Sequence, residues 1–86
     1  MGSTKFGGVL FVAYPNDHLP RHVHGFTGGI EVIVDLLLDG NAALAERADA
    51  VRPPNAKRSD VKKILSAAAA YFDELVELWE KNHDKA

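Results

Sequence analysis

The hydrophobic and polar positions in the first half of the chain follow the two-residue period of β strands. Residues 9–14 form a continuous apolar run of β-branched and aromatic side chains that Pro15 ends, which predicts a strand buried on both faces. Residues 30–38 alternate instead, with an apolar side chain at every even position and Glu31 and Asp35 among the odd ones. This alternation predicts a half-buried strand with one core face.

Turn residues separate the predicted strands. Thr27-Gly28-Gly29 and Asp39-Gly40 are typical of tight β hairpins, because glycine adopts the positive φ angles that these turns need. Residues 41–50 are ambiguous, since their alanine, leucine, glutamate and arginine content favours a helix. Because they follow a hairpin turn, we predict instead a fourth strand that pairs with residues 30–38.

One long amphipathic helix is predicted from about residue 60 to residue 82. Ser59 is a good N-cap, and Asp60 in the first turn interacts favourably with the helix dipole. At about 100° per residue, the apolar side chains fall in an arc about 120° wide, which is expected to face the core. This arc consists of Val61, Ile64, Leu65, Ala68, Phe72, Leu75, Val76 and Trp79. A second apolar shoulder beside it consists of Ala67, Tyr71 and Leu78.

These elements predict a single α+β domain over residues 1–86, with a small antiparallel sheet of three to four strands and one long C-terminal helix packed on one face. Residues 1–8 are expected to be a flexible lead-in, 9–50 the sheet, 51–58 a basic connector and 59–83 the helix. A single helix covers only one face of the sheet, so Ile33 and Leu37 would stay exposed on the other. We therefore expect a homodimer or a separate protein partner.

Composition narrows the class of protein. The chain of 86 residues has no cysteine, which excludes disulfides and thiolate metal sites. It lacks both an apolar run of roughly 18 residues and a signal-peptide pattern, so we expect a soluble cytoplasmic protein without a membrane segment. Residues 47–63 carry a net charge of +4, although the whole chain carries −2. This basic segment could contact a phosphate backbone or an acidic protein, but a solvent-exposed charged loop is the simpler alternative.

Three of the four histidines lie close together between Pro15 and Gly25, namely His18, His22 and His24. His22 and His24 are two residues apart, so on a strand both imidazoles point to the same face. The flanking prolines favour a turn, which would bring Asp17 and His18 back beside the pair. This cluster is the candidate functional site of the chain.

The order of these residues resembles a small bacterial family known as domain of unknown function 4160. The resemblance covers roughly residues 9–82, and its motifs are Asn16-Asp17-His18-x-Pro20-x-His22-x-His24 and, in the helix, Asp73-Glu74-Leu75-Val76-x-x-Trp79. It implies a compact bacterial cytoplasmic protein whose gene lies in a short operon similar to toxin–antitoxin pairs. It supplies no established activity.

One interpretation of the histidines is a metal site. Three imidazoles and one carboxylate could bind a divalent ion such as zinc with an open position, as catalytic zinc sites do. The ligands would be His18, His22, His24 and Asp17. No named motif has this spacing.

A second interpretation is acid–base catalysis on RNA. His22 and His24 would be the catalytic residues, because imidazoles titrate near neutrality and can exchange protons with a ribose hydroxyl. Arg21, Lys57 and Arg58 are the candidates for contact with a phosphate or a partner.

A third interpretation is structural. Asn16, Asp17 and His18 would hydrogen-bond the backbone of a proline-rich turn, and the domain would recognise a partner protein. The sequence thus predicts a histidine-cluster domain that is one component of a toxin–antitoxin-like pair and binds metal or acts on RNA. The alternative is a non-catalytic interaction domain, and whether the chain is an enzyme stays open.

Overall fold

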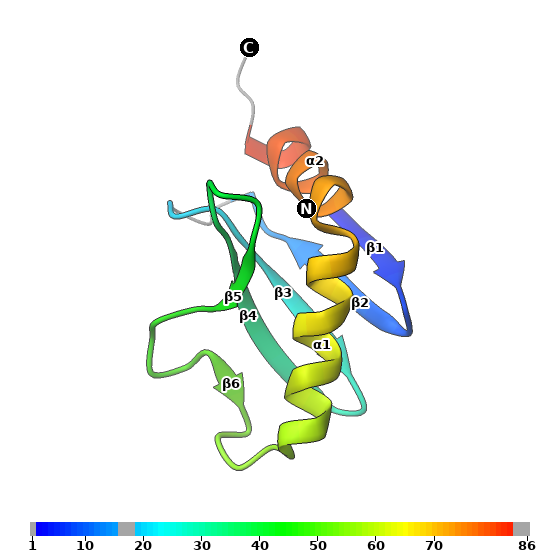
Figure 1. Ribbon diagram of the computed structural model, residues 1–86, viewed down its shortest axis with the longest axis vertical. Helices are drawn as coiled ribbons and strands as arrows, with labels where there is room; N and C mark the ends of the chain where they lie inside the picture. The colour runs from blue at the N-terminus through cyan, green and yellow to red at the C-terminus, as the bar shows by residue number, and fades with distance from the viewer. Residues whose placement is uncertain (1, 16–18, 84–86) are drawn as a thin grey trace.

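A computed structural model describes residues 2–15 and 19–83, which form an antiparallel sheet and two helices (Figure 1). The predicted α+β class is confirmed, but the described part has six strands rather than three to four, and its helical region has two segments. The elements in chain order are β1 (Gly2–Phe6), β2 (Val9–Ala13), β3 (His22–Thr27), β4 (Ile30–Leu36), β5 (Ala42–Leu44), β6 (Val51–Arg52), α1 (Arg58–Ala70) and α2 (Phe72–His83).

The sheet follows the chain, with the strand order β1-β2-β3-β4-β5 and every neighbouring pair antiparallel. Two Gly-Gly pairs make this meander possible, because all four glycines adopt positive φ angles in two-residue turns. The pair Gly28-Gly29 joins β3 to β4, as predicted. The pair Gly7-Gly8 joins β1 to β2, so the expected lead-in over residues 1–8 was wrong, since residues 2–6 are an edge strand.

The region with ambiguous composition is neither one helix nor one strand. β5 pairs with β4 through Ala42 opposite Leu36 and Leu44 opposite Val34. Residues 45–50 then leave the sheet, and β6 returns to pair with the earlier part of β4. Backbone hydrogen bonds fix both ends of this excursion, from Ala45 N to Ile33 O (3.0 Å) and from Ile33 N to Ala50 O (2.8 Å).

The excursion corrects one expectation about exposed sheet surface. Ile33 is only 2% exposed, because Ala45 and Ala50 pack on it. Leu38 is 93% exposed, because β4 ends at Leu36 and Leu38 lies in the following turn rather than on the core face. The uncovered face that motivated a partner is therefore smaller than the sequence suggested.

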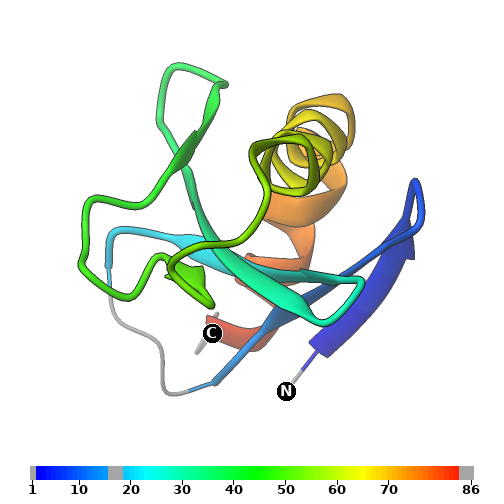
Figure 2. The same cartoon turned by 90° about the horizontal axis from the view of Figure 1, so that it is seen from below.

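The helix bends at Tyr71 (φ −115°, ψ 32°), which separates α1 from α2. The bonds from Tyr71 N to Ala67 O and from Leu75 N to Tyr71 O persist at 3.0 Å each, so the bend leaves the helical hydrogen bonds on both sides intact. α1 contacts β3, β4 and β5, whereas α2 contacts β1, β2, β3 and β4 (Figures 1 and 2). Because strands twist relative to one another, one straight helix would not follow all of them.

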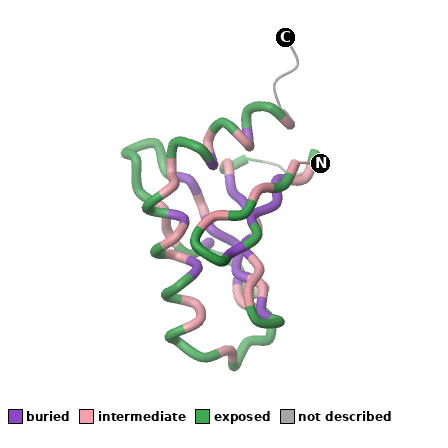
Figure 3. Tube along the Cα trace, turned by 90° about the vertical axis from the view of Figure 1, so that its right-hand side faces the viewer, coloured by how far each residue is buried: buried purple, intermediate pink, exposed green. Residues whose placement is uncertain are grey.

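The core lies between the helices and the sheet (Figure 3). The predicted apolar arc is confirmed, since Ile64, Ala68, Leu75 and Trp79 are buried and its other members pack partly buried against them. The helix begins at Arg58 with Lys57 as its N-cap, and not with Ser59. Within the described residues, neither helix is long and apolar enough to span a membrane.

The edge strand β1 covers the second apolar shoulder of the helices. The Phe6 ring stacks on Tyr71 with centroids 4.3 Å apart, and Gly2 lies against Leu78 and Asn82 of α2. Ala67 and Leu78 pack against the core as well. β1 therefore covers part of this shoulder, which the expectation of a flexible lead-in over residues 1–8 did not include.

Candidate functional site

The candidate site is built on β3, which brings His22 and His24 together. Their ring centroids lie 5.4 Å apart, as expected for alternate residues that share one face of a strand. The hairpin register places His22 opposite Asp35 and His24 opposite Ile33. The pair thus faces the side of β4 that carries its acidic residues.

Both imidazoles form hydrogen bonds through Nδ1. His22 Nδ1 lies 2.8 Å from Pro20 O, and His24 Nδ1 lies 2.8 Å from Glu31 Oε2. A carbonyl and an ionised carboxylate can only accept, so each Nδ1 carries a proton and donates it. These bonds orient both rings.

Aromatic side chains enclose the pair. The His22 ring lies 5.4 Å from Trp79 of α2, and the His24 ring lies 4.8 Å from Tyr14 in an edge-to-face arrangement. His22 is 6% exposed, and the Nε2 atoms of both histidines are inaccessible to solvent. Trp79, His22, His24 and Tyr14 therefore form one packed row.

A chain of charged groups continues from His24 across the sheet. Glu31 Oε1 lies 3.9 Å from Arg52 Nη1, and Arg52 Nη2 donates to Asp49 (3.1 Å). Arg47 donates twice to the same carboxylate, at 2.6 and 3.0 Å, and these bonds lower the pKa of Asp49. Two of the basic residues of segment 47–63 are thus paired with carboxylates rather than displayed to a phosphate.

Asp35, opposite His22, is the other perturbed carboxylate. Burial raises its pKa, and this is the largest effect, whereas the charge of His22 lowers it. Among the smaller effects, the charge of Glu46 raises the pKa and that of Arg47 lowers it. The net direction is upward, so the folded protein holds a proton on Asp35 more tightly than the unfolded chain does.

Asp35→Asn should therefore stabilise the protein at neutral pH. The contribution of protonated Asp35 to the stability of the folded protein is complete below the unfolded pKa of about 3.9. This contribution is lost as the pH rises through the higher pKa of the folded state. Asparagine cannot ionise, so the variant avoids this loss. Thermal unfolding should show a melting temperature higher by a few degrees at about pH 7 and little difference at about pH 3.5. A lower melting temperature for the variant at pH 7 would contradict this expectation.

The candidate phosphate contacts do not gather around the histidines. Arg21 Nε donates to Leu36 O (2.8 Å) and Arg21 Nη2 to Leu37 O (3.3 Å), so the guanidinium is hydrogen-bonded to the backbone at the end of β4. Lys57 and Arg58 lie at the start of α1, at the opposite end of the molecule from the start of β3 (Figure 1). The described residues thus assemble no joint site from these three cations and the histidine pair.

The predicted metal site can be described only in part. His18 and Asp17 lie outside the described residues, so only His22 and His24 of the four proposed ligands can be placed. In residues 2–15 and 19–83, no group of three or more histidine, aspartate or glutamate side chains is positioned to hold a metal ion.

Sequence reasoning missed the partners of the histidine pair. A two-residue turn at Gly28-Gly29 pairs residue 27 with 30, and counting back places His22 opposite Asp35. The same count puts Glu31 diagonally next to His24 on the same face, within reach of a side chain. The position of the hairpin turn therefore predicts both acidic neighbours of the histidine pair. No local feature of the sequence predicts that Trp79 packs against His22.

Comparisons with protein-family models, with curated proteins and with solved structures find no match. The resemblance to domain of unknown function 4160 stays a prediction, and the geometry alone supports the functional argument below.

Proposed function

We propose that the chain is a non-catalytic protein-interaction domain, one component of a toxin–antitoxin-like pair, in which His22 and His24 are structural. The observation that supports this most is the enclosure of the pair. Each ring donates through Nδ1 to a neighbouring group and packs on an aromatic side chain, Trp79 or Tyr14.

The enclosure of the histidine pair is unfavourable for the catalytic interpretation. A general acid or base has to come within hydrogen-bond distance of its substrate. Here the Nε2 atoms of both rings are shielded from solvent, and each Nδ1 is held by Pro20 O or Glu31. The pair is better suited to fix the start of β3 against α2 and β4 than to exchange protons with RNA.

The partner surface in this proposal is the leucine hairpin, defined as Leu37, Leu38 and Leu44. These side chains are 37%, 93% and 41% exposed, and all belong to the β4–β5 connection or its strands. Leu44 pairs with Val34 and so lies on one face of the hairpin. Leu37 follows on the other face and Leu38 lies in the turn, so the three leucines surround the tip of the hairpin. Exposed apolar side chains of this kind are candidate contact sites. The hairpin would bind an apolar surface on the partner.

The test is co-expression of the full chain with the product of the adjacent gene, followed by size-exclusion chromatography with light scattering. We expect a stable complex with the wild type and at least a tenfold weaker one with Leu38→Lys, because lysine puts a charge into an apolar contact. Leu10→Lys is the matched control, since Leu10 is 40% exposed on β2. A complex that both variants leave unchanged would refute the surface, and the wild type alone shows whether a homodimer forms.

His24→Ala separates the three interpretations of the histidines. If His24 is structural, the variant should lose about 1–3 kcal/mol of unfolding free energy, because the Glu31 carboxylate loses a part-buried hydrogen-bond donor. The loss should be the same with a chelator or with added zinc. Zinc that stabilises the wild type but not the variant would instead support a metal site, and zinc-independent RNA cleavage by the wild type alone would support catalysis.

A further inference from the structure

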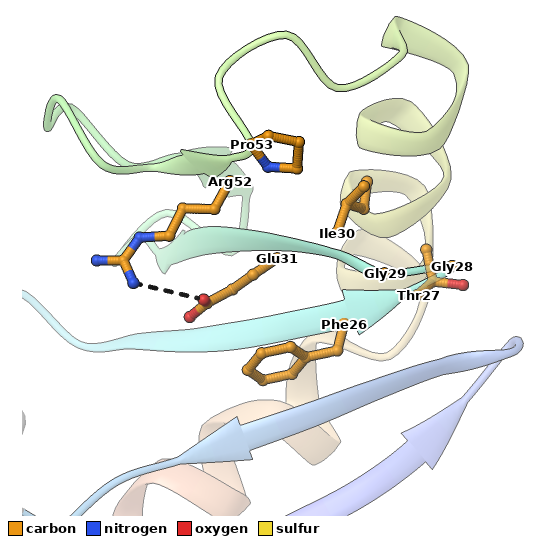
Figure 4. Close-up of a pocket in the computed structure, with 8 residues that line it drawn as sticks. All are labelled: Phe26, Thr27, Gly28, Gly29, Ile30, Glu31, Arg52 and Pro53. Atoms are coloured by element: carbon orange, nitrogen blue, oxygen red, sulfur yellow. Dashed lines mark ion pairs between the residues drawn. The ribbon is translucent and has the colours of Figure 1, made fainter.

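A groove of about 560 Å³ lies at the turn end of the β3–β4 hairpin, next to the start of the connector (Figure 4). It extends to Glu31, the hydrogen-bond partner of His24. Its volume falls in the range of roughly 300–1,000 Å³ that is typical of ligand sites. Phe26, Glu31, Arg52 and Pro53 line it, with the Gly28-Gly29 turn at its rim. A Cβ atom built on either glycine would meet nothing within 4 Å, so the rim is open.

The groove combines three chemically different groups. In Figure 4 the Glu31 carboxylate lies between the Arg52 guanidinium on one side and the Phe26 ring on the other. The side chain of Glu31 is 21% exposed and that of Arg52 is 59% exposed, so both can reach a ligand. The groove thus offers an acceptor pair, a cation and a flat apolar surface.

Glu31 has capacity for a further partner. Its Oε2 accepts from His24, but each carboxylate oxygen has two lone pairs. Its Oε1 lies 3.9 Å from Arg52 Nη1, which is longer than a hydrogen bond. Arg52 is held more closely by Asp49, at 3.1 Å, so a ligand could bind Glu31 without removing the partner of Arg52.

We propose that this groove binds a guanine nucleotide, either free or within single-stranded RNA. Guanine is the base whose Watson–Crick edge presents two adjacent N–H donors, N1–H and N2–H, which match the two oxygens of a carboxylate. Phe26 provides a surface on which the base stacks. Arg52 provides the cation for the adjoining phosphate. This inference is independent of the proposed protein-interaction function, since it concerns a different surface.

The test uses the isotope-labelled full chain and follows amide NMR signals, among which Gly28 and Gly29 report directly on the rim. The probes are GMP, IMP, AMP and guanosine. IMP lacks only the N2 amino group, so it should bind about tenfold more weakly than GMP, and AMP should bind more weakly still. An oligouridine with one guanosine distinguishes the sources, because tighter binding than GMP indicates RNA and equal binding indicates the free nucleotide.

Three variants assign the contacts. Arg52→Ala should reduce GMP binding to the level of guanosine and lower its salt dependence, while Arg58→Ala, an exposed arginine outside the groove, should change neither. Glu31→Gln should remove the preference for GMP over IMP. Phe26→Leu keeps the side chain apolar but removes the stacking surface, so it should weaken the binding of all the nucleotides alike. It also tests the groove independently if Glu31→Gln disturbs the position of His24.

Two results would overturn the proposal. One is equal binding, or no binding, of GMP, IMP and AMP to the folded wild type. The other is an equal loss of GMP binding in Arg52→Ala and Arg58→Ala, which would mean that nucleotides bind to the basic segment in general rather than to this groove.

Discussion

Trp79→Ala should leave a large fraction of the chain unfolded at 25 °C. Trp79 is 6% exposed in the core and packs on the His22 ring, so the variant loses buried apolar area and leaves a cavity. Such substitutions cost about 3–5 kcal/mol, and the total stability of a small domain is often near 5 kcal/mol. Urea unfolding followed by circular dichroism measures the loss.

Two controls define this result. Leu38→Ala should change the unfolding free energy by less than about 0.5 kcal/mol, because Leu38 is 93% exposed. Phe72→Ala should fall between the two, since Phe72 is only partly buried. A loss below about 1 kcal/mol for Trp79→Ala would mean that α2 does not complete the core as described.

Gly25→Val should be comparably destabilising, for the opposite reason. A Cβ atom on Gly25 would lie 2.6 Å from Ile64 Cγ2 and 3.1 Å from Phe11 Cε1, and both neighbours are fully buried. Gly25 thus lets α1 approach β3 closely. Overpacking costs about 1–3 kcal/mol for a small addition, so Gly25→Ala should fall in this range and Gly25→Val should exceed it.

A double-mutant cycle tests the cause of this loss. Ile64→Leu conserves volume but removes the Cγ2 methyl that a new Cβ would meet, and alone it should cost less than about 1.5 kcal/mol. If the contact with Ile64 is the cause, the double variant Gly25→Ala and Ile64→Leu should be more stable than the sum of the single losses by at least about 0.5 kcal/mol. Strict additivity would place the cause elsewhere.

The parts of the fold that depend on local chemistry were predictable. The 3.6-residue period identified the buried residues Ile64, Leu75 and Trp79, and Gly28-Gly29 identified a hairpin. The same two-glycine signal at Gly7-Gly8 was overlooked, because the strand before it is short and mostly polar. The bend at Tyr71 could not be predicted, since no proline or glycine marks it and its contact with Phe6 is tertiary.

The features of the candidate site were likewise predictable where local chemistry decides them, and not where tertiary contacts do. That His22 and His24 share a face follows from strand periodicity, and their acidic neighbours follow from hairpin register. Arg21, a candidate for contact with a phosphate or a partner, donates to the Leu36 and Leu37 carbonyls, and only the folded sheet shows that these carbonyls are near. For the same reason, the sequence could not predict that residues far apart in the chain enclose the histidines.

The packing of β1 against α2 has a consequence for biosynthesis. β1 is translated before α2, yet α2 supplies Leu78 and Asn82, the side chains that lie against Gly2. Contacts between elements that are far apart in sequence form slowly, because a long loop must close before they do. Until α2 emerges, β1 lacks its contacts with Leu78 and Asn82, and it depends on its pairing with β2. β1 is the terminal strand of the described sheet, so its outer edge can pair with other nascent chains during this time. The interval between the synthesis of β1 and that of α2 is therefore a time in which this edge strand is incompletely packed and open to aggregation.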